Sequence, residues 1–225
     1  MPSKKAKKTA SVNKKKHEVF LPLLVLTFLL WIFYRSIFNF PVWFDESIGK
    51  LVFFALPVLL YVSISGNKEI LATFALRKFK PGLLLGLAIG GIFGFVGVLI
   101  SVLSKGGEVI FLPHYLADWF WKEMFLAIMT GFWETLFFFS FVMIIVEEKF
   151  HYFSLLKQIL LVATVFLLFH LPNTIIRFNS EVLLFQLFLL FTFACGQALL
   201  FYSRRNAYLL VVTQAIWGMV LLINF

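Results

Sequence analysis

The sequence predicts an all-α protein, a polytopic bundle of about seven transmembrane helices. Of its 225 residues, 61% are hydrophobic and 14% are charged, with a mean hydropathy of +0.95. A soluble domain has about 45–50% apolar and about 25% charged residues. A helix needs about 20 mostly apolar residues to cross a bilayer. Seven stretches qualify, at roughly 19–38, 50–65, 82–103, 119–146, 155–172, 182–202 and 207–224.

The chain begins with a basic tail over residues 1–18, which we expect to be disordered and cytoplasmic. Seven of the 20 Lys and Arg residues lie in its first 16 positions. A basic segment directly before a span binds anionic lipid, so membrane lipid is the expected partner. The lysines are not accompanied by an aromatic or Gly-rich RNA-reading motif, and we expect no nucleic-acid partner. The following apolar run is too long for a cleaved signal peptide.

The distribution of basic residues predicts the orientation. Cytoplasmic connections carry an excess of Lys and Arg. With the N-terminus inside, the inner segments hold 15 basic residues and the outer ones hold 5. We therefore expect a plasma-membrane protein with a cytoplasmic N-terminus and, after seven spans, an external C-terminus. The five residues assigned to the outer side are Arg35, Lys50, Lys105, Lys122 and Arg177.

The third span is rich in glycine, which predicts close contact with a neighbouring helix. Residues 68–80 before it are expected to form an amphipathic connector on the inner membrane surface. This divides the chain into N-terminal spans with their connector, 19–80, and a core, 81–225. The glycines at three- and four-residue spacing are Gly86, Gly90, Gly91, Gly94 and Gly97.

Few ionisable residues lie deep in the predicted spans, and such residues mark functional sites. Glu134 interrupts the run "GFWETLFFFSF" at 131–141, and His170 lies near the end of the fifth span. At about 1.5 Å per residue, they lie about 18 Å and about 22 Å from the inner side, so they can meet in one layer. Gln214 lies at about 10 Å. A Glu134–His170 pair and two separate helix–helix hydrogen bonds are both open at this point.

Three fragments resemble the motifs of the CPBP family, the CaaX-protease and bacteriocin-processing intramembrane proteases, also called Abi proteins. They are "ETLFFFS" at 134–140, "FLLFH" at 166–170 and "NAYLLVVTQAIWG" at 206–218. The family pattern is Glu-Glu-x-x-x-Arg, Phe-x-x-x-His and His-x-x-x-Asn. Glu134 matches the first Glu, and Phe166 and His170 match the second motif. Gln214 takes the position of the second His. The resemblance covers about residues 85–225.

The chain departs from the family pattern at four polar positions. Thr135 replaces the second Glu, Phe139 the Arg, Gln214 the second His and Gly218 the Asn. Loss of the Glu and the Arg together avoids a stranded buried charge. We assign Thr135, Phe139 and Gly218 as support of the site. Asn173 follows Pro172, where we expect the helix to end; its amide either bonds the freed backbone or reaches the site.

The resemblance implies hydrolysis of a peptide bond inside the bilayer by a water that Glu134 activates. A carboxylate held among phenylalanines is a stronger base than one in water. His170 and Gln214 would complete the site, since either can donate to an oxyanion. The resemblance also allows zinc, bound by Glu134 and His170. A catalytic zinc ion takes about three protein ligands, so we expect no metal and no other cofactor.

Two other functions stay open. The chain can be a catalytically inactive relative that binds a peptide or a membrane-protein partner in the same cavity. It can also be a small transporter or channel, although an ion path would show several charged groups along one route. One carboxylate and one imidazole at depth count against transport.

Overall fold

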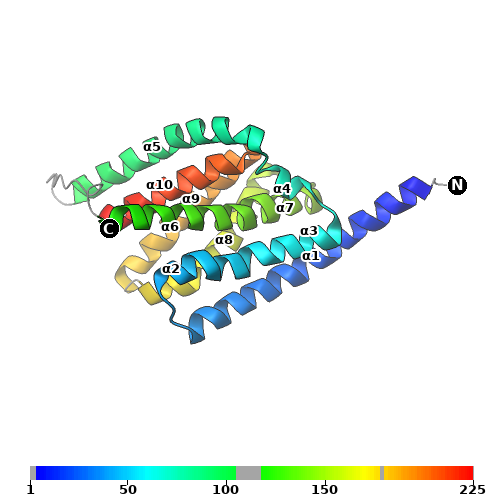
Figure 1. The fold of residues 1–225 in the computed structure, drawn as a ribbon, viewed down its shortest axis with the longest axis horizontal. Helices are drawn as coiled ribbons and strands as arrows, with labels where there is room; N and C mark the ends of the chain where they lie inside the picture. The colour runs from blue at the N-terminus through cyan, green and yellow to red at the C-terminus, as the bar shows by residue number, and fades with distance from the viewer. Residues whose placement is uncertain (1–3, 105–117, 178–179, 225) are drawn as a thin grey trace.

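The computed structural model describes residues 4–104, 118–177 and 180–224, and these residues form an all-α bundle without a β-strand (Figure 1). Within this part, six helices are long and apolar enough to cross a membrane, and Ala207–Val220 is a shorter apolar helix. All seven predicted spans therefore have a counterpart. The N- and C-termini lie at opposite ends of the bundle (Figure 1).

The helices follow the chain in order, with short turns between several of them. Their bounds are α1 Lys4–Ile37, α2 Val42–Phe44, η1 Asp45–Gly49, η2 Leu51–Ala55, α3 Leu56–Ser65, α4 Glu69–Ala72, η3 Leu76–Lys78, α5 Phe79–Ser104, α6 Asp118–Glu134, η5 Thr135–Met143, α7 Ile144–Lys149, α8 Leu155–Arg177, α9 Ser180–Arg204 and α10 Ala207–Asn224. The segments η1, η2 and η5 are π-helical and η3 is a 3₁₀ turn.

The helix α1 begins at Lys4, so the tail predicted to be disordered is helical here from that residue. Ala and Lys are strong helix formers. The tail also continues directly into a span, so it needs no separate helix nucleus. In Figure 1 this part of α1 extends beyond the rest of the bundle.

The second span is longer than predicted. It runs from Val42 to Ser65, starting directly after Pro41, whereas the apolar run suggests a start near residue 50. Proline favours a helix start because its φ is already close to the helical value. The charged first half, "DESIGK" at 45–50, lowers the local hydropathy but belongs to the membrane-spanning helix.

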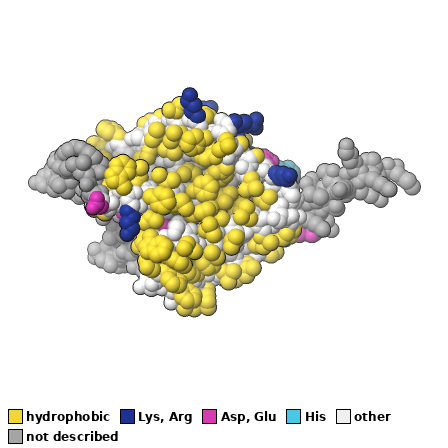
Figure 2. Space-filling model, in the orientation of Figure 1, with side chains coloured by type: hydrophobic (Ala, Val, Ile, Leu, Met, Phe, Trp, Pro, Cys, Tyr) yellow, Lys and Arg dark blue, Asp and Glu magenta, His cyan; other side chains and the backbone are white. Residues whose placement is uncertain are grey.

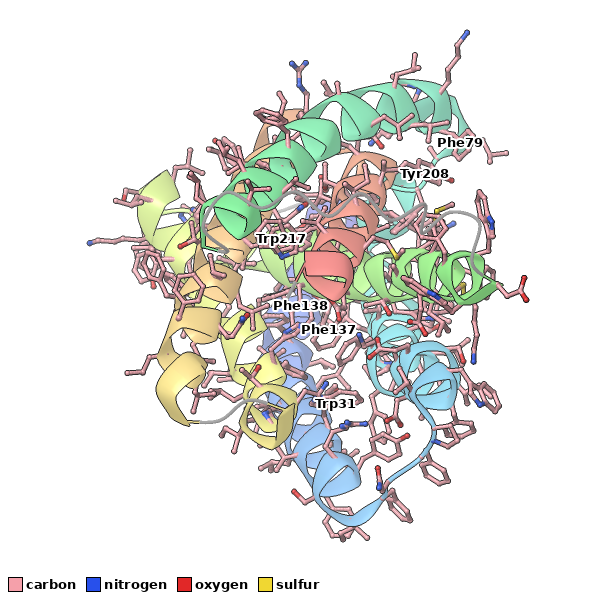
Figure 3. All side chains as sticks on the ribbon, turned by 90° about the vertical axis from the view of Figure 1, so that its left-hand side faces the viewer. Trp31, Phe79, Phe137, Phe138, Tyr208 and Trp217 are labelled. Atoms are coloured by element: carbon pink, nitrogen blue, oxygen red, sulfur yellow. The ribbon has the colours of Figure 1, made fainter. Side chains whose placement is uncertain are left out.

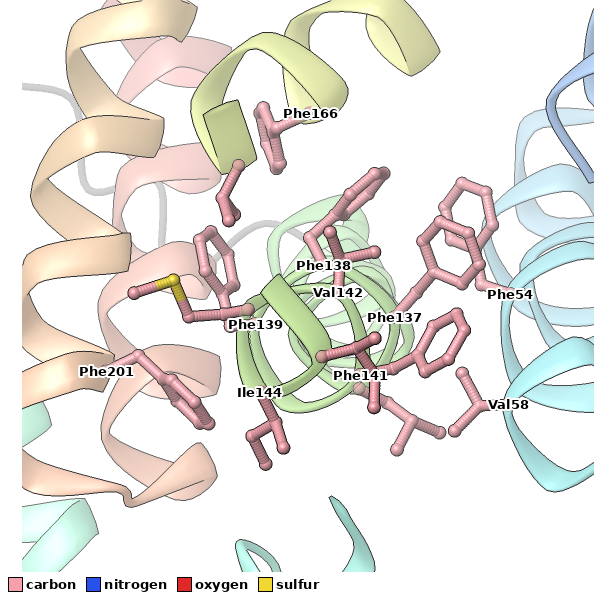
Figure 4. Close-up of a cluster of buried hydrophobic side chains, with 14 of the residues drawn as sticks. Phe54, Val58, Phe137, Phe138, Phe139, Phe141, Val142, Ile144, Phe166 and Phe201 are labelled. Atoms are coloured by element: carbon pink, nitrogen blue, oxygen red, sulfur yellow. The ribbon is translucent and has the colours of Figure 1, made fainter. Parts of the chain in front are cut away.

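The segment Asp118–Lys149, made of α6, η5 and α7, is the central helix of the bundle. In its most apolar window 72% of the residues are buried, against 22–33% in the other five long spans. A helix that is hydrophobic on all sides belongs in an interior. Phenylalanines radiate from it toward the neighbouring helices (Figure 4). The rings of Phe54 and Phe137 stack with centroids 5.1 Å apart, and the rings of Phe138 and Phe166 meet edge-on at 4.9 Å.

The glycines of α5 let this helix approach α10 closely, as predicted. A Cβ atom on Gly86 would lie 2.7 Å from Val212 Cβ, and one on Gly90 would lie 2.5 Å from Ile216 Cδ1. Gly91 is the exception, because a Cβ atom there would meet nothing within 4 Å.

The connector before α5 is fastened to the start of α10. Tyr208 donates its hydroxyl proton to the Phe74 carbonyl at 2.8 Å, and the Ala207 amide donates to the Thr73 carbonyl at 3.2 Å. Ile70 and Thr73 are buried. The connector is therefore part of the packed structure, rather than a helix lying only on a surface.

The outer face of the bundle is mostly hydrophobic. Figure 2 shows one broad side covered by apolar side chains, with most of the visible charged groups toward its edges. Large exposed apolar residues occur on several helices, including Leu29, Leu60, Phe95 and Phe188. A bundle of apolar helices with such a surface is compatible with an integral membrane protein.

Candidate functional site

Glu134 ends α6 inside the bundle, with 3% of its surface exposed. The Lys50 ammonium donates to its Oε1 atom at 2.5 Å, and both side chains are buried. Lys50 is also paired with Glu46, one helical turn earlier. The Thr130 hydroxyl donates to Glu46 Oε2 at 2.6 Å. An ammonium group thus joins two carboxylates from different spans.

The predicted position of Lys50 on the outer side is wrong, since its ammonium group is buried against Glu134. The error follows from the late predicted start of the second span, because hydropathy falls wherever charged residues gather. The Glu46–Lys50 spacing of four residues, just after Pro41, is the signal for a helix that already carries an ion pair at this point.

His170 and Gln214 complete the surroundings of Glu134, so of the two arrangements left open by the sequence the structure has the Glu134–His170 contact. His170 Nε2 lies 3.4 Å from Glu134 Oε1. Its other ring nitrogen, Nδ1, lies 2.8 Å from the Phe166 carbonyl and is the donor there, because a carbonyl oxygen only accepts. The Gln214 amide nitrogen donates to Glu134 Oε2. Both carboxylate oxygens are therefore in contact with protein groups.

The helix α8 passes through Pro172 to Arg177, so the prediction that it ends at this proline is wrong. Proline removes a backbone donor, but a membrane helix tolerates this where side chains satisfy the backbone. The Trp31 indole donates to the Phe169 carbonyl at 2.9 Å. The Thr174 hydroxyl donates to the His170 carbonyl at 2.8 Å. These bonds also hold the turn that carries the His170 ring.

A cavity of about 540 Å³ borders this cluster. Glu134, His170, Gln214, Asn173 and Gly218 all line it, which brings five of the seven predicted site residues together. The helices that contribute are α6, α8, α9 and α10, together with the second span. Since Glu46 and Lys50 line it as well, the site crosses the predicted division at residue 80. The apolar part of the wall includes Leu126, Phe166, Leu190, Phe193, Trp217 and Met219. Seen end-on in Figure 3, Trp217 lies within the ring of helices.

Thr135 and Phe139 do not line the cavity, although they were predicted to support the site. Both are fully buried. Residue 135 is rotated by about 100° from residue 134 around the helix axis, which turns its side chain away from Glu134. Within the described residues, Thr135 Oγ1 has no hydrogen-bond partner. The Phe139 ring lies 6.0 Å from that of Phe166 in the apolar core (Figure 4).

Three polar atoms of cavity-lining residues have no hydrogen-bond partner in the described part of the chain. They are Asn173 Oδ1, Gln214 Oε1 and Trp217 Nε1. Of the two roles considered for Asn173, the structure supports reaching the site.

The residues around Glu134 do not fit a catalytic zinc ion. Glu134 and His170 are two candidate ligands, and three would be needed. The Lys50 ammonium contacts the same Oε1 atom that faces His170. Among the residues that the structure describes, no group of three or more His, Cys, Asp or Glu side chains is arranged for a metal.

The structure adds charges that the sequence did not place at depth. Glu46 and Lys50 join Glu134 and His170 along one cavity. From the sequence we counted one carboxylate and one imidazole deep in the spans, and this number is too low. The scarcity of deep charged groups is therefore no longer an argument against a transporter or channel.

Comparisons with models of protein families, with curated proteins and with solved structures gave no match.

Proposed function

We propose that the chain is a plasma-membrane protein that binds an apolar peptide segment in the cavity beside Glu134, without hydrolysing it. The proposal rests on the contacts that both carboxylate oxygens of Glu134 already make with other side chains. Lys50 and His170 face its Oε1 atom and Gln214 donates to its Oε2 atom. A general base must accept a proton from a water within hydrogen-bond reach. A carboxylate held in this way positions helices rather than water.

The cavity suits an apolar guest with some polar character. Ligand cavities of about 300–1,000 Å³ are usually lined by apolar side chains with a few polar groups, and 540 Å³ lies in this range. Leu126, Leu190 and Phe193 supply apolar wall. Asn173, Gln214 and Trp217 are polar or part-polar residues in the same lining. In this proposal the N-terminus is cytoplasmic, and its basic tail attracts anionic lipid.

The second candidate is the endopeptidase implied by the resemblance to CPBP proteins. One observation favours it: Glu134, His170 and Gln214 converge on a single cavity. In this mechanism Lys50 releases Glu134, which takes a proton from water as the water oxygen bonds to the peptide carbonyl carbon. Glu134 then passes that proton to the amine nitrogen as the C–N bond breaks. Gln214 or His170 donates to the oxyanion. No step needs a metal.

One experiment separates the two. Purified protein in lipid nanodiscs is mixed with a pool of labelled membrane peptides, alongside Glu134→Gln and a chelator-treated sample. We expect peptides to be retained and recovered intact. Cleavage products that are absent with Glu134→Gln would overturn the binding proposal in favour of a protease, and their persistence with chelator would indicate a metal-free mechanism. Glu134→Gln keeps the size of the side chain and leaves Lys50 paired with Glu46, so it is a suitable variant.

A further inference from the structure

The cavity lies in the half of the bundle away from the N-terminal tail, with Glu134 near its deep end. The second span and α6 begin at this end of the bundle, and they line the cavity through 42–50 and 123–134. The helices α8 and α10 run toward the same end and line it through 166–174 and 214–219. This end of the bundle faces the viewer in Figure 3.

The other half of the bundle is filled by side chains. Phe137, Phe141 and Tyr61, which follow the cavity toward the tail, have none of their surface exposed. At the tail end, the Lys78 ammonium donates to the Arg205 carbonyl at 2.6 Å and ties the connector to the turn between α9 and α10. Within the described residues, the cavity therefore has no route toward the tail.

Contacts between neighbouring helices close the cavity at its sides. Phe193 of α9 stacks on Trp217 of α10, with ring centroids 5.2 Å apart. The helices α6 and α10 touch through their backbones, since a Cβ atom on Gly131 would lie 3.0 Å from the Val211 carbonyl oxygen. A hydrogen bond from α6 to Glu46 joins α6 to the second span. A peptide approaching from the lipid would meet packed helices at these three contacts.

The volume of the cavity limits what it can hold. A helix with its side chains is about 10–12 Å across and rises about 5.4 Å per turn, so one turn fills about 420–610 Å³. A membrane-spanning helix of 20 residues fills about 2,400–3,400 Å³ on the same basis. The cavity has about 540 Å³, which is room for one turn and not for a whole span.

We propose that the cavity receives a short peptide segment, of about one helical turn, that enters from the external side of the membrane. Val42 lines the cavity at the start of the second span and is 52% exposed, so the lining reaches the surface of the described part of the chain. This end is external because the tail at the opposite end is cytoplasmic in the proposed orientation. That the occupant is a peptide rests on the proposed function, whereas its size and its side of entry rest on the cavity.

The side of entry is tested with single cysteines in a Cys195→Ser background, since Cys195 is the one cysteine of the chain. Ala127→Cys lies in the cavity, Ser203→Cys is exposed at the tail end, and Ala163→Cys is fully buried. A membrane-impermeant thiol reagent is added to right-side-out and to inverted membrane vesicles. We expect Ala127→Cys to react only in right-side-out vesicles, Ser203→Cys only in inverted ones, and Ala163→Cys in neither. Reaction of Ala127→Cys only in inverted vesicles, or in neither, overturns the inference.

The size of the occupant is tested on the same Ala127→Cys variant in nanodiscs. The probes are a blocked Leu/Ala tetrapeptide and a 20-residue Leu/Ala helix flanked at both ends by two lysines. At ten times its Kd, the tetrapeptide should slow labelling about tenfold by mass action, and the flanked helix should not slow it. Slowing by the flanked helix overturns the size limit, while peptide binding stands. If neither probe slows a reaction that occurs from the external side, the side of entry stands and the peptide-binding function fails.

Discussion

Replacing Lys50 by Met should be among the most destabilising single changes in this chain. At 2.5 Å, the attraction between Lys50 Nζ and Glu134 Oε1 is about 7 kcal/mol with an effective dielectric constant of about 20. This gross attraction offsets a desolvation cost of several kcal/mol for each ion. Lys50→Met leaves both Glu46 and Glu134 without their ammonium, while their desolvation cost remains. We expect the free energy of unfolding to fall by about 3–5 kcal/mol.

Glu134→Gln should cost less than Lys50→Met. Lys50 keeps Glu46 as a partner in that variant, so no buried charge loses all its partners. We expect the free energy of unfolding to fall by about 1.5–3 kcal/mol. A larger loss of unfolding free energy for Lys50→Met than for Glu134→Gln is what we expect when one ammonium group is shared by two carboxylates.

The assay is reversible unfolding in mixed micelles by titration with dodecyl sulfate, followed by far-ultraviolet circular dichroism. Lys122→Met is the matched control, because Lys122 is exposed near the start of α6 and its replacement should change the free energy by no more than about 0.5 kcal/mol. A loss of less than about 1 kcal/mol for Lys50→Met, or equal losses for Lys50→Met and Glu134→Gln, would refute the shared pair.

The α5–α10 contact and the buried hydroxyl of Thr135 give two further predictions. Gly86→Ala should destabilise the bundle by about 1–3 kcal/mol, because the new Cβ atom would lie 2.7 Å from a side-chain atom of α10. Gly91→Ala has open space and should be neutral or stabilising by up to about 1 kcal/mol; the same unfolding titration compares them, and equal losses would contradict the packing. Thr135→Val should leave stability unchanged or raise it by up to about 1 kcal/mol, because it removes a buried hydroxyl without a partner among the described residues. Thermal unfolding in detergent checks this, and a clear drop in Tm would show that the hydroxyl has a partner.

The fold was largely predictable because it depends on hydropathy and helix length. Each predicted span has a helical counterpart, and the glycine spacing in the third span correctly indicated close contact. Depth along each helix made a contact between Glu134 and His170 possible, but it could not show that the two side chains face each other, so the alternative of two separate hydrogen bonds stayed open.

The ion pair was not predictable in the same way. Lys50 and Glu134 are 84 residues apart, and hydropathy counts a buried, neutralised lysine exactly as it counts an exposed one. The prediction that α8 ends at Pro172 was wrong for a related reason. One donor to the backbone near it, the Trp31 indole, lies 138 residues away in the sequence, and local sequence does not show that contact.

The order in which the ion-pair partners occur along the chain has a consequence for biosynthesis. Proteins are made from the N-terminus, so the helix with Glu46 and Lys50 enters the bilayer before the central helix. When Glu134 follows, its counter-ion is already at the required depth. His170 and Gln214 arrive only afterwards. The first four helices can therefore insert with this carboxylate neutralised, and the last three assemble onto a partner whose charge is already compensated.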